Sequence, residues 1–129
     1  MSLAELRGKR IFVTGATGFV GTALVERLLR CVPDVELVLL VRDGRRSPAQ
    51  RRVDRELLRN DCFDRLREEL GEDGFARRCE QVQVVAGDVG TDGLGLDDGG
   101  RAALATCDVV IHSAATVAFD SPLDRAVEV

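Results

Sequence analysis

Three glycines spaced three residues apart constrain this chain more than any other feature. Gly15, Gly18 and Gly21 lie between a short apolar run and the start of a helical pattern. The run from Arg10 to Thr14 is apolar and rich in β-branched residues, which predicts a strand. The pattern from Phe19 to Cys31 places apolar residues on one stripe, which predicts an amphipathic helix. The glycines therefore form a tight turn between a strand and a helix.

Each glycine of this turn has its own predicted role. Gly15 lets the backbone leave the strand through conformations that a Cβ forbids. Gly18 leaves no side chain where a pyrophosphate approaches the main chain, and Gly21 lets the helix pack closely on its strand. The helix then directs its unpaired N–H groups at the phosphates. The turn predicts a dinucleotide site, whose candidate residues are Gly15, Thr17, Gly18, Phe19, Val20 and Gly21. A turn that merely bends the chain is the alternative, which the flanking strand and helix disfavour.

The rest of the chain alternates predicted strands with helical segments. Further strands are expected at 35–41, 81–89 and 107–112, and helices at 48–70, with a break near Asn60-Asp61, and at 99–105. We expect a loop or cap at 71–78 and a loop at 90–98. This alternation predicts an α/β fold, a Rossmann-like doubly wound parallel sheet with helices on both faces. Right-handed crossovers give the strand order 3-2-1-4.

The residues after the second strand bear on the choice of cofactor. Arg42 comes directly after that strand, and Asp43 follows it. In a dinucleotide fold, an Arg here accommodates the 2′-phosphate of NADP, whereas an acidic residue binds the ribose 2′-OH of NAD. Arg42 favours NADP(H) as the cofactor, and a shift of one position would place Asp43 there and favour NAD. A solvated charge cluster is the purely structural alternative.

The end of the fourth strand is the third candidate region. Ser113, Ala114 and Ala115 are small residues directly after a central strand, where they let a cofactor lie against the backbone. His112 precedes them and is the only histidine in the chain. A lone histidine at a strand end more often packs and forms hydrogen bonds, so no catalytic residue is assigned.

Composition excludes several other classes. The 18 basic and 22 acidic residues give a net charge of −4, so nothing predicts nucleic-acid binding. The four cysteines lack Cys-x-x-Cys spacing, so we predict reduced thiols rather than a metal site or a disulfide framework. The N-terminus lacks the apolar stretch of a signal peptide. The longest uncharged run, Ile11 to Val25, is too short to span a bilayer. A cytoplasmic protein without a transmembrane segment is expected.

Several motifs in this order resemble one family. They are Thr14 to Gly21, Leu40-Val41-Arg42 followed by a long insertion, Gly87-Asp88, and His112 to Asp120. Together they resemble the reductase group of extended short-chain dehydrogenases/reductases. That group includes fatty acyl-CoA reductases, the male-sterility proteins, and the reductase domains of carboxylic acid reductases and some peptide synthetases. The resemblance covers about Arg10 to Val129.

This resemblance implies that NADPH reduces a fatty acyl thioester to an aldehyde or alcohol by hydride transfer. It also implies that Asp88 and Val89 contact the adenine ring, whereas a Gly-Asp pair that only favours a turn is the alternative. In the family, a downstream Tyr-x-x-x-Lys supplies the proton donor. This chain contains no Tyr, and its only Lys is Lys9. We therefore expect residues 1–129 to be the N-terminal part of an NAD(P)-binding domain that does not turn over substrate by itself.

Two other functions fit the same pattern less well. A non-catalytic NADP-sensing module would use the same turn and would not need a Tyr-x-x-x-Lys. A Rossmann-like methyltransferase also has a glycine turn, but such enzymes favour an acidic residue after strand two, where this chain has Arg42. The sequence therefore favours the reductase.

Overall fold

The computed structural model describes residues 3–32, 34–43 and 48–113, and a four-stranded parallel sheet forms its centre. The strands are β1 Arg10–Thr14, β2 Glu36–Val41, β3 Val82–Ala86 and β4 Val109–His112. Their order is β3-β2-β1-β4, and all three pairings are parallel. The predicted order 3-2-1-4 is confirmed.

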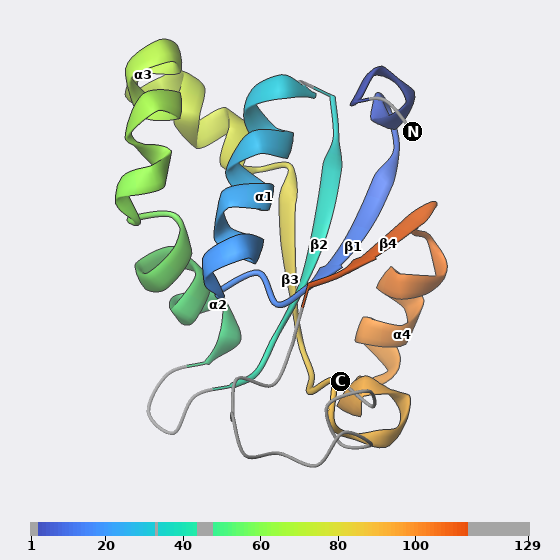
Figure 1. The fold of residues 1–129 in the computed structure, drawn as a ribbon. Coiled ribbons are helices and arrows are strands. Elements are labelled where there is room, and N and C mark those ends of the chain that lie inside the picture. The colour runs from blue at the N-terminus through green and yellow to red at the C-terminus, as the bar shows by residue number, and fades with distance from the viewer. Residues whose placement is uncertain (1–2, 33, 44–47, 114–129) are drawn as a thin grey trace.

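Helices cover both faces of this sheet (Figure 1). On one face lie α1 Phe19–Cys31, α2 Ala49–Arg52 and α3 Asp64–Cys79, and on the other lies α4 Asp98–Ala105. Short helical turns complete the path, namely η1 Leu3–Leu6, η2 Val53–Leu57, η3 Asp61–Phe63 and η4 Asp92–Gly95. This arrangement is the predicted doubly wound α/β fold.

The two central strands carry the core because they are covered on both faces. Alternate residues of β1 enter different apolar clusters, since successive side chains of a strand point to opposite faces. Ile11 and Val13 pack with α1 and the α2–α3 segment, whereas Phe12 packs with Leu96 and with Ala103 of α4. All three β1 side chains are fully buried. Continuous apolar runs are typical of such parallel strands.

One predicted loop is wrong. Residues 71–78 were expected to form a loop or cap, but α3 continues through them to Cys79. Gly71 has φ 71° and ψ 172°, which are not helical angles, so α3 consists of two helical segments joined by a kink at Gly71. After the bend, the Phe75 ring meets Phe63 edge-on at 6.3 Å, and the Arg67 guanidinium lies 4.8 Å from its centre. These contacts hold the second half of α3 against the first.

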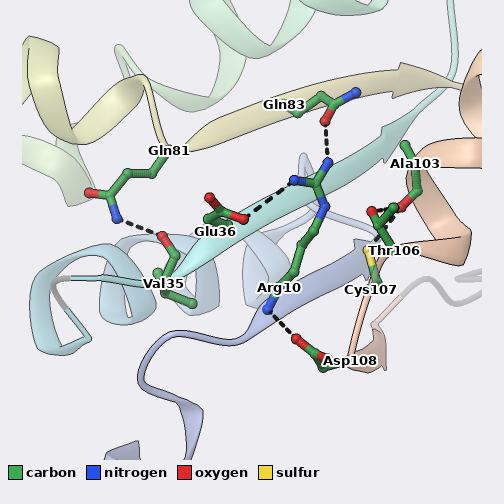
Figure 2. Close-up of polar contacts among 9 residues, drawn as sticks. All are labelled: Arg10, Val35, Glu36, Gln81, Gln83, Ala103, Thr106, Cys107 and Asp108. Atoms are coloured by element: carbon green, nitrogen blue, oxygen red, sulfur yellow. Dashed lines mark hydrogen bonds and ion pairs between the residues drawn. The ribbon is translucent and has the colours of Figure 1, made fainter.

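Polar side chains tie the strands together at the edge where they begin (Figure 2). The Arg10 guanidinium contacts Glu36 Oε2 at 3.4 Å and Gln83 Oε1 at 2.5 Å. The Arg10 N–H donates to Asp108 Oδ2 at 2.9 Å, just before β4. One arginine therefore links β1 to residues at the start of all three other strands. These contacts lie at the amino edge of the sheet. The glycine turn lies at the opposite, carboxyl edge, where parallel folds bind their ligands.

Candidate functional site

The glycine turn leaves β1 at the carboxyl edge of the sheet. Gly15 has φ +72°, a left-handed backbone conformation that residues other than glycine rarely adopt. Its carbonyl oxygen accepts a hydrogen bond from the Gly18 N–H at 3.1 Å, which closes the turn. The predicted need for glycine at this position is therefore a property of the backbone itself.

Gly21 is required by packing. A Cβ built on Gly21 would lie 1.8 Å from the Gly15 carbonyl oxygen and 2.6 Å from its carbonyl carbon. The first turn of α1 therefore rests directly on the backbone of the glycine turn. The Thr22 hydroxyl strengthens this contact by donating to the Ala16 carbonyl at 3.0 Å. The close approach that the sequence predicts is made against the turn rather than against the strand.

Gly18 differs from the other two because nothing among the described residues requires it to be glycine. Its φ of −77° and ψ of 172° are open to any residue. A Cβ built there would be 3.4 Å from its nearest neighbour, the Gly15 carbonyl oxygen, which is an ordinary contact. Gly18 occupies the N-cap position of α1 but has no side chain to cap it. The fold therefore leaves this helix end bare.

The backbone N–H groups at this bare end are available. The first hydrogen bond of α1 runs from the Thr22 N–H to the Gly18 carbonyl at 2.9 Å. Among the residues that the structure describes, the N–H groups of Phe19, Val20 and Gly21 have no acceptor. The Phe19 and Val20 side chains are 95% and 66% exposed, and the first turn holds no acidic residue. Unpaired N–H groups at a helix N-terminus bind anions.

A second group of residues lies where β2 ends. Arg42 is exposed, and its guanidinium has no hydrogen bond or ion pair within the described ranges. Asp43, in contrast, has a hydrogen-bond partner in the fold. Its Oδ1 accepts the N–H of Ala49, the first residue of α2, at 2.8 Å. The Arg42 carbonyl is held by the Arg52 side chain at 2.7 Å. Of the two residues that the sequence left in competition, Asp43 already has a structural role.

The third group follows β3, which ends at Ala86 rather than at the predicted Val89. Asp88 turns the chain there, because its Oδ1 accepts the Gly90 N–H at 2.9 Å. The turn-forming role that the sequence offered as an alternative is therefore present. The second carboxylate oxygen, Asp88 Oδ2, and the Val89 N–H have no hydrogen-bond partner in the part of the chain that the structure describes.

The end of β4 joins the end of β1 through side chains. Thr14 Oγ1 lies 2.7 Å from His112 Nδ1, and the Ser113 hydroxyl donates to the Thr14 carbonyl at 2.5 Å. His112 thus forms hydrogen bonds at a strand end, as the non-catalytic interpretation expects. Ala114 and Ala115, the other predicted contacts of this region, lie outside the described residues.

Among the described residues, the remaining reactive side chains form no cluster that could hold a metal ion. Burial raises the pKa of the Cys62, Cys79 and Cys107 thiols, so these groups stay protonated at neutral pH. Within residues 3–32, 34–43 and 48–113, no cluster of His, Cys, Asp and Glu side chains could hold a metal ion. No helix in those ranges is both long and apolar enough to cross a membrane.

Comparison with known protein sequences shows the family to which this chain belongs. Residues 13–129 match the family model described as male sterility protein, an NAD-binding domain. The chain belongs to this family. A putative fatty acyl-CoA reductase of Drosophila melanogaster is 39% identical over 124 residues, which are 95% of this chain and 23% of that protein. Probable fatty acyl-CoA reductase 5 of Arabidopsis thaliana is 39% identical over 123 residues, 92% of this chain and 25% of that protein.

Solved structures agree with this assignment. The terminal R domain from the myxalamid biosynthetic pathway aligns with a TM-score of 0.65 at 29% identity, covering 93% of this chain and 28% of that one. The reductase domain of a non-ribosomal peptide synthetase from Mycobacterium tuberculosis aligns with a TM-score of 0.60 at 34% identity, covering 92% and 28%. The predicted resemblance to the fatty acyl-CoA reductase group is confirmed. The chain spans about a quarter of the length of the curated relatives that it matches, and the part that it spans is the one matched by the family's NAD-binding model.

Proposed function

We propose that this chain is the NADPH-binding portion of a reductase that transfers hydride to a fatty acyl thioester and releases an aldehyde or alcohol. The observation that carries the proposal is the bare helix end at Gly18. Its neighbours Gly15 and Gly21 are required by the fold itself, whereas Gly18 is required by neither backbone nor packing. An approaching diphosphate supplies the missing reason, because a side chain there would keep it away from the N–H groups.

The residues present fit a bound dinucleotide phosphate. The N–H groups of Phe19 and Val20 would hold the diphosphate at the positive end of α1, with Thr17 beside them in the turn. Asp88 Oδ2 and the Val89 N–H would face the adenine, and Ser113, at the end of β4, is the described member of the predicted cofactor contacts Ser113, Ala114 and Ala115. When bound, NADPH supplies the hydride.

Arg42 supports NADPH over NADH. A guanidinium forms charge-assisted, often bidentate, hydrogen bonds with a phosphate, and Arg42 has its guanidinium available. The residue that would have favoured NADH is Asp43, and one of its carboxylate oxygens, Oδ1, already accepts the Ala49 N–H. The 2′-phosphate would therefore meet a cation that no described residue neutralises.

Arg42→Ala is expected to raise the Kd for NADPH about 10- to 100-fold, because one charge-assisted contact is lost. The Kd for NADH should change less than about twofold, because NADH lacks the 2′-phosphate. Isothermal titration of both nucleotides into the complete protein measures the two values. Asp43→Asn serves as the control, since it keeps a capping oxygen and should leave the ratio unchanged. Equal losses for both nucleotides in Arg42→Ala would remove the phosphate assignment.

Turnover tests the reaction itself. Residues 1–129 hold no Tyr and a single Lys, Lys9, so the Tyr-x-x-x-Lys that the family resemblance implies is not among them. The complete protein is expected to consume NADPH in the presence of a long-chain acyl-CoA or acyl-carrier protein and to release an aldehyde or alcohol. NADPH binding without any such consumption would favour the alternative, a non-catalytic NADP-sensing module.

A further inference from the structure

The loop after β3 contains a backbone conformation that its sequence does not favour. Leu94 has φ 60° and ψ 15°, and it is the one non-glycine residue with positive φ in the part of the chain that the structure describes. Gly93 and Gly95 on either side also have positive φ. A left-handed conformation is unfavourable for leucine and free for glycine. A residue held in this way calls for a reason in its surroundings.

The conformation turns the Leu94 carbonyl back onto the end of β3. Its oxygen accepts the Asp88 N–H at 2.7 Å, and the Leu94 N–H donates to the Thr91 carbonyl at 2.9 Å. The carbonyl lies so close to the strand end that a Cβ on Gly87 would be 2.5 Å from its oxygen. The Leu94 side chain is half-buried against the apolar cluster that contains Phe12 and Leu96. Leucine therefore ties the loop to the core, which glycine cannot do.

These contacts decide which polar groups of the loop remain available. The Asp88 N–H donates to the Leu94 carbonyl. Asp88 in turn accepts two hydrogen bonds, from the Gly90 N–H to its Oδ1 at 2.9 Å and from the Thr91 N–H to its carbonyl at 3.1 Å. Asp88 Oδ2 and the Val89 N–H are left over. One is a hydrogen-bond acceptor and the other a donor, and they belong to adjacent residues. Adenine presents the complementary pair on its pairing edge, the N6 amino group as donor and ring nitrogen N1 as acceptor.

We propose that Leu94 is a positioning residue for the adenine end of the cofactor, holding Asp88 Oδ2 and the Val89 N–H in register with that edge. This inference rests on the proposed NADPH site. The strained backbone supplies the carbonyl that fixes Asp88, and the apolar side chain fixes the backbone. Removing the side chain should therefore relax the loop and weaken recognition of the base while leaving the diphosphate contacts at Gly18 intact.

The test compares NADPH with its hypoxanthine analogue in the complete protein. Hypoxanthine carries an acceptor at position 6 and a donor at N1, the reverse of adenine, and the rest of the analogue is identical. The wild-type protein is expected to bind NADPH about tenfold more tightly than the analogue, because two hydrogen bonds are mismatched. Leu94→Met keeps an apolar side chain and should keep that ratio. Leu94→Gly and Leu94→Asn tolerate the left-handed backbone without the anchor, and their ratio should fall toward one.

The outcomes separate this inference from the function on which it rests. If the wild-type protein binds neither nucleotide, the proposed function itself is wrong. If it binds both equally, or if Leu94→Gly and Leu94→Asn discriminate as the wild type does, only the role of Leu94 is overturned. Should one of these two variants fail to fold, the other still tests the role of Leu94, because both lack the apolar side chain that packs on the core.

Discussion

Replacing Gly21 with Ala is expected to destabilise the protein by about 3 kcal/mol, at the upper end of the usual cost of overpacking. The new Cβ would lie 1.8 Å from the Gly15 carbonyl oxygen, 2.6 Å from the Gly15 carbonyl carbon and 3.0 Å from the Ala16 Cα. All three are backbone atoms, so no side chain can rotate away. Either α1 or the glycine turn must shift, and both are fixed by the central strand β1.

Urea unfolding followed by circular dichroism measures this effect, with the midpoint falling and the m-value unchanged. Gly99→Ala in α4 is the matched control. A Cβ there would meet its nearest atom, Asp97 Oδ1, at 3.5 Å. Because alanine is the better helix former, this control should be neutral or more stable by up to about 1 kcal/mol. A Gly21→Ala protein as stable as the control would show that α1 does not depend on contact with the turn.

Gly18→Asp is expected to move stability and affinity in opposite directions. An Asp at the N-cap accepts a hydrogen bond from the first helical turn and favours the positive end of the helix, which adds about 0.5 kcal/mol. The same carboxylate would occupy the N–H groups and the negative charge would repel a diphosphate. The affinity for NADPH should fall at least about 100-fold, equivalent to about 2.7 kcal/mol. A purely structural glycine would not give this combination.

The sequence predicted the fold well because its signals are local. A strand, a glycine turn and a helix follow one another within 22 residues of Arg10, and the apolar run 35–41 marks a covered strand. The sequence indicated the break at Gly71, but the helical segment that follows it to Cys79 was missed. That segment packs Phe75 on Phe63, a contact between side chains that no local pattern reveals.

The candidate site was only partly visible in the sequence. The motif named three glycines together, whereas the structure separates Gly15 and Gly21, which the fold requires, from Gly18, which it does not. The sequence also left Arg42 and Asp43 in competition, because nothing in the pattern shows that Asp43 caps a helix six residues later. The left-handed backbone of Leu94 has no sequence signal, since leucine avoids that conformation.

Calorimetric titration of NADPH into the wild-type protein, Gly18→Asp and Gly18→Ala tests the central claim most directly. Each protein is first shown to be folded by its urea midpoint. Gly18→Asp is expected to keep wild-type or higher stability, and Gly18→Ala to lose no more than about 1 kcal/mol because alanine is a poorer N-cap than glycine. In both, the new Cβ meets its nearest atom at 3.4 Å. Binding should weaken in Gly18→Ala and become undetectable or nearly so in Gly18→Asp. Wild-type affinity in a folded Gly18→Asp protein would show that the N–H groups at the start of α1 do not hold the cofactor.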